Sequence, residues 1–200
     1  MLKSRVFLYL AFLFLVCPLA TAEIIDWTCD DDGDGAIVME SALFGPSAEG
    51  YSLELICTQN WYPGHLQGDF ITDTPEDPTV SLVQIITNDT DFVWTDYHIT
   101  IGMPQPFSIV GAFGPTDWTW NVTPATDGLA LPGHPSPGTG WVGTIDYFAG
   151  SPIPIGGSGT FGFVVSFEGT VSFCTEQIPT PEPTSVLLLA LGALTVLRRR

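Results

Sequence analysis

The sequence predicts an all-β protein, an antiparallel β-sandwich of the jelly-roll or Ig-like kind, with a helix at the N-terminus and a short hydrophobic helix at the C-terminus. Short segments alternate between apolar and polar residues, as in residues 51–55 and 161–167, which is the pattern of strands with one buried face. Gly, Pro, Asn and Asp separate these segments. Between the two terminal segments, no stretch has the apolar spacing of an amphipathic helix.

Each expected strand is a run rich in β-branched and aromatic residues, bounded by turn residues. Residues 123–158 are rich in Gly and Pro, so we expect a long loop region around one strand. Residues 178–182 are expected to form an extended, Pro-rich spacer. The expected strands cover residues 36–44, 51–58, 79–87, 92–101, 107–113, 117–122, 141–148, 160–167 and 170–175.

The N-terminus has the pattern of a secretory signal peptide. Two basic residues precede an apolar core of eleven residues, 6–16. The small residues Ala20 and Ala22 then form a small-x-small cleavage site. Residues 1–22 are therefore predicted to be removed on export, which leaves Glu23 as the first residue of the mature chain.

The C-terminus carries a short polar motif, an apolar run and a basic end. Pro181, Glu182 and Pro183 precede the apolar residues 186–197. This order of parts resembles the PEP-CTERM sorting signal of Gram-negative bacteria, and it assigns residues 179–200 to that signal. The apolar run has twelve residues, whereas a membrane-spanning helix needs about 20, so its insertion would have to be tilted or thin the membrane. An ordinary C-terminal membrane anchor is the alternative, and the Pro-Glu-Pro directly before the run favours the sorting signal. The basic end consists of Arg198, Arg199 and Arg200.

The resemblance implies a place and a partner for the protein. Proteins with this signal are exported and are processed near the Pro-Glu-Pro motif by an exosortase, an integral-membrane protease-transpeptidase. The resemblance therefore implies transient contact of the C-terminal segment with the inner membrane. It also implies a final location in the cell envelope, on the cell surface or in the extracellular matrix. Genes of this family often accompany machinery for extracellular polysaccharide, which makes polysaccharide an expected partner.

The charge distribution narrows the range of partners. All five basic residues lie in the terminal segments, and no Lys or Arg occurs in residues 6–197. All 22 acidic residues lie in residues 23–182. Nucleic acid is therefore not an expected partner, because binding to its phosphates requires Lys or Arg. Water, backbone N–H groups or divalent cations must meet the carboxylates instead.

An Asp-rich segment near the start of the mature domain, residues 23–178, is a candidate calcium site. Asp30, Asp32 and Asp34, followed by glycine, match the first half of an EF-hand loop, in which oxygen ligands alternate along the chain. The twelfth position of such a loop is a serine here, and the expected carboxylate falls one residue early, at Glu40. A solvated acidic turn between strands is the alternative.

Three cysteines remain after removal of the signal peptide. Three cysteines allow one disulfide, with three pairings, in an exported protein. Cys29 with Cys57 is favoured slightly over the pairings that use Cys174, because it would tie the Asp-rich segment to a nearby strand. No C-x-x-C motif is present, which argues against a redox motif or a zinc knuckle.

The remaining motifs favour a structural or adhesive protein without catalytic activity. His65, His98 and His134 lack the spacing of a zinc enzyme, and no G-x-S-x-G motif is present. A carbohydrate-binding module with exposed tryptophans is the alternative function, and Trp118 with Trp120 is expected to share one strand face. A core role is the commoner fate of such residues. A secreted glycoside hydrolase is less favoured, because no pair of carboxylates stands out.

Overall fold

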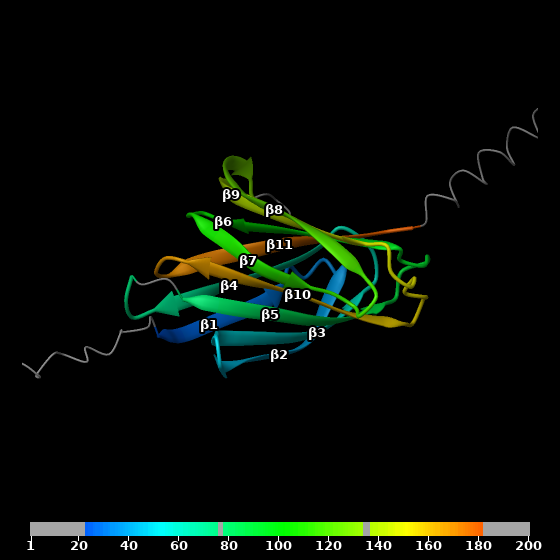
Figure 1. The fold of residues 1–200 in the computed structure, drawn as a ribbon, viewed down its shortest axis with the longest axis horizontal. Helices are drawn as coiled ribbons and strands as arrows, with labels where there is room; N and C mark the ends of the chain where they lie inside the picture. Colours follow the sequence, from blue (N-terminus) through cyan, green and yellow to red (C-terminus); the bar gives the residue numbers. More distant parts are fainter. Residues whose placement is uncertain (1–22, 76–77, 134–136, 182–200) are drawn as a thin grey trace, which may run out of the picture.

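The computed structural model describes residues 23–75, 78–133 and 137–181, and these residues contain strands and turns but no helix. The fold is a β-sandwich of two sheets, drawn as two layers in Figure 1. The all-β prediction is therefore confirmed. The signal peptide and the hydrophobic C-terminal segment lie outside the described residues. None of the described residues forms a helix that could cross a membrane.

The larger sheet has six strands and includes both ends of the described chain. All of its neighbouring strands pair antiparallel. Its order, from edge to edge, is β1 (Ile24–Asp31), β4 (Gly64–Thr72), β11 (Val171–Thr180), β6 (Asp96–Met103), β9 (Thr139–Phe148) and β8 (Thr119–Ala130).

The smaller sheet has five strands, of which one pair is parallel. Strands β3 and β5 run in the same direction because β4, which joins them, crosses to the other sheet. The sandwich is thus mostly, rather than wholly, antiparallel. The order is β2 (Ile37–Ser47), β3 (Gly50–Gln59), β5 (Thr79–Asn88), β10 (Ser158–Phe167) and β7 (Phe107–Phe113).

Aromatic rings fill the space between the sheets. Phe161 of β10 is fully buried, and its ring stacks on Tyr97 with centroids 4.4 Å apart. The rings of Trp118 and Tyr147 meet Phe161 edge-on, at 5.6 and 5.1 Å. Such edge-to-face and stacked pairs add to the free energy of burying the rings. Phe161 is therefore the centre of the core on this side of the sandwich.

The strand predictions need four corrections. Strands β1 and β4 were not expected. The expected strand 92–101 begins only at Asp96, because Trp94 forms an isolated bridge with Ile153. Strand β8 continues to Ala130 through residues expected to form a loop, and nearly all of its residues are exposed. Strand β11 continues to Thr180, so the first half of the expected spacer pairs with β6.

Candidate functional site

The Asp-rich loop joins β1 to β2 and is shaped by its own carboxylates. Asp31 Oδ1 accepts the backbone N–H of Gly33 at 3.0 Å. Asp32 Oδ1 accepts from the backbone of Asp34 at 3.2 Å, and Asp34 Oδ1 accepts from Ala36 at 2.6 Å. Each of these contacts is an Asx turn, in which a short side chain replaces a backbone acceptor. Consecutive Asp residues therefore fold the loop tightly without a helix.

His65 of β4 lies beneath this loop and contacts carboxylates through both ring nitrogens. Its Nδ1 is 2.9 Å from Asp32 Oδ2, and its Nε2 is 3.4 Å from Glu176 Oε2 in β11. The residue is only 5% exposed. A neutral imidazole has a single N–H, so both contacts are attractive only when the ring is protonated. His65 thus links the loop to β4 and β11 through contacts with two carboxylates.

The pKa of Asp32 is lowered by this arrangement. Partial burial acts to raise it, but the hydrogen bonds from the Asp34 backbone and from His65 stabilise the ionised form more strongly. A carboxyl whose pKa is lower in the folded chain stabilises the fold above the ordinary pKa of Asp. That contribution is lost as the pH falls through the lowered value.

The structure brings together only part of the predicted calcium site. Ligand atoms of Asp32, Asp34 and His65 lie within 4.8 Å of one another. Asp30 does not join them, because it belongs to β1 and lines a groove on the sheet face. Glu40 lies in β2, where its Oε1 accepts a hydrogen bond from the Thr58 hydroxyl at 2.6 Å. The loop therefore differs from an EF-hand, and it gains a histidine that the spacing did not indicate.

The cysteines are three buried free thiols in the structure. Cys29 of β1 and Cys57 of β3 belong to opposite sheets, and burial raises the pKa of each thiol to about 12. Cys174 lies elsewhere, with Leu131 and Val142 in a small apolar cluster. The favoured pairing of Cys29 with Cys57 thus stays a prediction.

Exported protein should contain a Cys29–Cys57 disulfide that forms during folding rather than after it. Thiols with a pKa near 12 hold almost no thiolate at neutral pH, and the thiolate is the reactive form. Intact mass under denaturing conditions should show the loss of two hydrogen atoms, with Cys174 alone open to alkylation. Alkylation of all three cysteines in unreduced protein would contradict the prediction.

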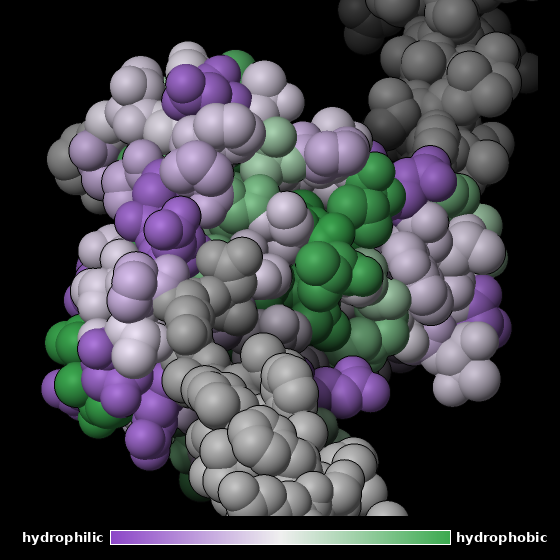
Figure 2. All heavy atoms as spheres, turned by 60° about the vertical axis from the view of Figure 1, so that its left-hand side comes forward, coloured by the Kyte–Doolittle hydropathy of each residue, from purple (hydrophilic) through white to green (hydrophobic). Residues whose placement is uncertain are grey.

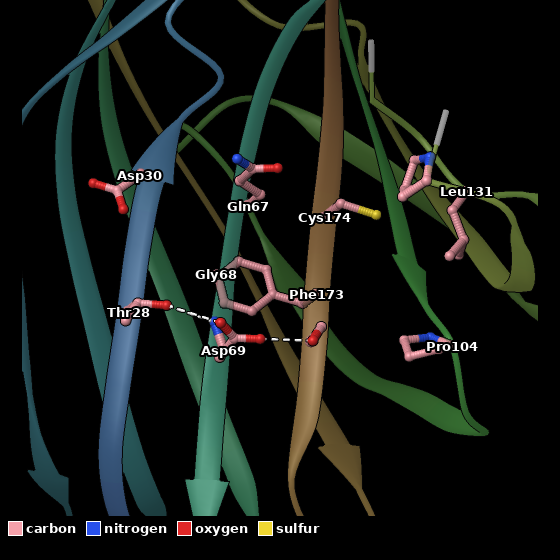
Figure 3. A pocket seen from close by; sticks show the side chains of 11 residues that line it. Thr28, Asp30, Gln67, Gly68, Asp69, Pro104, Leu131, Phe173 and Cys174 are labelled. Carbon is pink, nitrogen blue, oxygen red and sulfur yellow. Dashed lines mark hydrogen bonds between the residues drawn. The ribbon is translucent and has the colours of Figure 1, made fainter. Parts of the chain in front are cut away.

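A groove of about 430 Å³ lies on the outer face of the six-stranded sheet, where β1, β4 and β11 run side by side. Thr28, Asp69 and Ser172 are register partners on these three strands. The Thr28 hydroxyl donates to Asp69 Oδ2 at 3.3 Å, and the Ser172 hydroxyl donates to Asp69 Oδ1 at 2.6 Å. Figure 3 shows Asp69 held between these two hydroxyls. The carboxylate is therefore oriented before any ligand arrives.

The far wall of the groove is apolar. Leu131, Pro137 and Pro104 line it, opposite Asp69. Leu131 follows β8 and packs over Gly102 of β6, where a Cβ would come within 2.9 Å of its side chain. The missing side chain at Gly102 lets this wall approach the sheet. The groove thus combines carboxylates, hydroxyls and the Gln67 amide on one side with an aliphatic surface on the other.

The tryptophans do not form the expected binding platform. Trp118 precedes β8 and is 4% exposed, with its indole packed against Phe161 in the core, so the prediction that it shares a strand face with Trp120 is wrong. Trp120 is 39% exposed on the edge strand β8. Trp61 is 50% exposed beside the Asp-rich loop. Trp61 lies in the connection between β3 and β4, whereas Trp120 lies on β8, and neither lines the groove.

The expected targeting residues lie almost entirely outside the described residues. This holds for the cleavage residues Ala20 and Ala22 and for Glu182, Pro183 and the three terminal arginines. Pro181 is the last described residue and follows β11 directly. The sorting motif therefore begins where the paired part of the domain ends, so cleavage near the motif would leave the eleven strands intact.

Comparison with known families supports the C-terminal assignment. Residues 179–200 match the family model of the PEP-CTERM protein-sorting motif, which confirms the resemblance seen in the sequence. The match indicates an exported protein that an exosortase processes and that is sorted to the cell envelope or surface. Comparisons with curated proteins and with solved structures found no match.

Proposed function

We propose that the chain is a non-catalytic protein of the cell surface or extracellular matrix of a Gram-negative bacterium, where it associates with extracellular polysaccharide. The observation that carries this proposal is the groove on the outer sheet face. In this groove an aliphatic wall lies next to oriented hydroxyl and carboxylate groups. Ligand sites in proteins commonly combine apolar walls with a few placed polar groups. Sugars present both C–H faces and hydroxyls, which match these two sides.

The C-terminal motif supports the same proposal from the location of the protein. An exosortase would act on the chain while residues 186–197 contact the inner membrane, and the released domain would then meet polysaccharide outside the cell. The domain itself has no Lys or Arg, so anionic membrane surfaces offer it little attraction. Its lasting partners are therefore expected beyond the membrane.

The alternative to a binding groove is that the same groove is the active site of a glycoside hydrolase. Asp30 and Asp69 both line it as diagonal neighbours on adjacent strands, a relation that usually separates Cβ atoms by about 7 Å. A glycosidase needs one carboxyl held as a proton donor. Both oxygens of Asp69 instead accept hydrogen bonds from hydroxyls, so the geometry uses this side chain as an acceptor and not as a donor.

Cosedimentation of the exported protein with extracellular polysaccharide from its own host tests the proposal. We expect the protein to pellet with the polymer, and we expect the polymer to keep its length. An increase in reducing ends that Asp69→Asn abolishes would show a hydrolase instead. A protein that stays in the supernatant at every polymer concentration would contradict the association. A variant with both Trp61 and Trp120 replaced by Ala distinguishes the groove from a binding site made of exposed tryptophans. Only the tryptophan-based alternative predicts that this variant no longer binds the polysaccharide.

We also propose that Asp32 and Asp34 bind calcium weakly and thereby stabilise the domain. Binding to the folded state alone adds about 2.7 kcal/mol at a hundredfold excess over Kd, which is a measurable rise in Tm. Asp34→Asn keeps the oxygen that accepts from Ala36 but removes a charge, so the calcium-dependent rise should shrink. Melts with magnesium and with matched ionic strength are the controls. An equal rise with magnesium, or an unchanged calcium effect in Asp34→Asn, would refute the site.

A further inference from the structure

We propose that the groove selects polysaccharide units that carry a protonated amino group, such as glucosamine, over uronate or uncharged units. This inference rests on the proposed association with polysaccharide and names the sugar class that the groove would bind. It follows from the charge of the groove, from the orientation of Asp69 and from the contacts of the nearby histidines with other carboxylates.

Among the residues that the structure describes, the charged groups that line the groove are both acidic. Asp30 and Asp69 lie on neighbouring strands on the same face, and the remaining polar groups, such as Gln67 and Ser172, are neutral. Because residues 6–197 contain no Lys or Arg, the domain has no basic side chain of that kind to neutralise this pair. An anionic sugar would meet repulsion here, whereas an ammonium group would relieve the repulsion between the two carboxylates.

The histidines on this sheet face are already paired with other carboxylates. His65 contacts Asp32 and Glu176, as described above. His98 Nδ1 lies 2.7 Å from Asp146 Oδ1, on β6 and β9, and neither residue lines the groove. Among the described residues, therefore, no histidine competes with a ligand cation for Asp30 or Asp69.

Asp69 is prepared to receive a donor. The two hydroxyl donors take one lone pair on each of its oxygens and fix the plane of the carboxylate. The other lone pair on each oxygen remains for a ligand, and an ammonium group offers three donors. Charge-assisted hydrogen bonds of this kind are stronger than those between neutral groups. The aliphatic wall at Leu131 and Pro104 then contacts the C–H face of the same ring.

The size of the groove is compatible with a short stretch of glycan. The volume of about 430 Å³ falls within the range of about 300–1,000 Å³ common for small-molecule sites. The groove lies over β1, β4 and β11, with Leu131 and Pro104 on its far side (Figure 3).

The test compares short oligomers of glucosamine, of N-acetylglucosamine and of galacturonate, matched in length, for binding to the exported protein by calorimetry. We expect the glucosamine oligomer to bind at least about tenfold more tightly than its acetylated counterpart, since hydrogen bonds to charged groups contribute most. We also expect its binding to weaken with added salt. Asp69→Asn should remove this preference while leaving the Tm unchanged.

General attraction of a cation to an acidic protein needs its own control. Asp127→Asn removes the same charge from an exposed position on β8, where Asp127 Oδ1 accepts the backbone N–H of the adjacent Gly128. That variant should bind the glucosamine oligomer as the wild type does. An equal loss in Asp127→Asn and Asp69→Asn would overturn the groove as the site. Tighter binding of the acetylated or uronate oligomer would overturn the amino-sugar preference but leave the proposed function standing. Binding of no polysaccharide at all would remove both.

Discussion

Deletion of Pro181, Glu182 and Pro183 should hold the protein in the cell, where the wild type is released or displayed. The physical reason is that the apolar residues 186–197 stay attached and keep the chain at the inner membrane when the exosortase does not recognise it. The expected effect is close to all-or-none. Fractionation of cells into inner membrane, envelope and medium, followed by immunoblotting, measures it.

The matched control for this deletion changes the adjacent polar pair and keeps the motif. Thr184→Ala with Ser185→Ala alters two residues of the same segment, and this variant should be sorted as the wild type is. Release of the deletion variant in wild-type amounts would mean that the motif is not read. Retention of the alanine variant in the cell would mean that sorting is lost on any change in this segment, and not specifically on loss of the motif.

Phe161→Ala should lower the free energy of unfolding by about 3–5 kcal/mol, the range found when a buried Phe is truncated to Ala. The ring is fully buried and contacts Tyr97, Trp118 and Tyr147, so its removal leaves a cavity among three large rings. A domain of this size is typically stable by about 5–15 kcal/mol, so much of its stability would be lost. Urea unfolding followed by tryptophan fluorescence measures the change.

Val110→Ala on β7 provides the comparison, since this residue is 59% exposed. Its effect should stay within about 0.5 kcal/mol, as is usual for surface substitutions. Phe161→Leu, which keeps most of the volume, should fall between the two. Equal effects of Phe161→Ala and Val110→Ala would mean that the aromatic cluster does not hold the sheets together.

Period-two alternation predicted the sandwich because most strands bury one face only. Strands β10 and β3 illustrate this, with Phe161, Phe163 and Val165 buried on alternate positions of β10. Strands β1 and β4 were missed for a physical reason. β1 is an edge strand with mostly exposed residues, and β4 contains Gly68, where a side chain would collide with the Thr28 carbonyl and the ring of Phe173.

The surface of the molecule is less regular than alternation alone suggests. Some large apolar residues face solvent, including Ile56 and Ile85, which are register partners on β3 and β5. Figure 2 shows a band of hydrophobic residues near the middle of the face in view, with polar residues beside it and smaller hydrophobic areas elsewhere. A strand with β-branched residues on both faces cannot be assigned an inner face from the sequence alone.

The candidate sites depended on residues that only the fold brings together. The Asp-rich loop was visible in the sequence because its ligands are consecutive. His65 and Glu176 were not, since they reach the loop from strands 111 residues apart in the chain. The row of Thr28, Asp69 and Ser172 likewise arises from the pairing of three strands. No local sequence pattern shows which residues of distant strands will be paired.

The tryptophan prediction was wrong because the chain turns at the position where a strand was expected. Trp118 precedes β8, and its indole N–H donates to the Ser151 carbonyl at 3.0 Å. Two residues later, Trp120 is part of the strand and faces outward. Spacing of two places side chains on one face only inside a strand, and the strand begins at Thr119.

The eleven-stranded domain is expected to work outside the cell, without either targeting segment. Intact mass spectrometry of the protein recovered from the surface or medium of its own host tests this most directly. We expect a chain that begins at Glu23 and ends near Pro181 to Pro183. Recovery of an exported chain that still carries Met1 or Arg200 would contradict the claim.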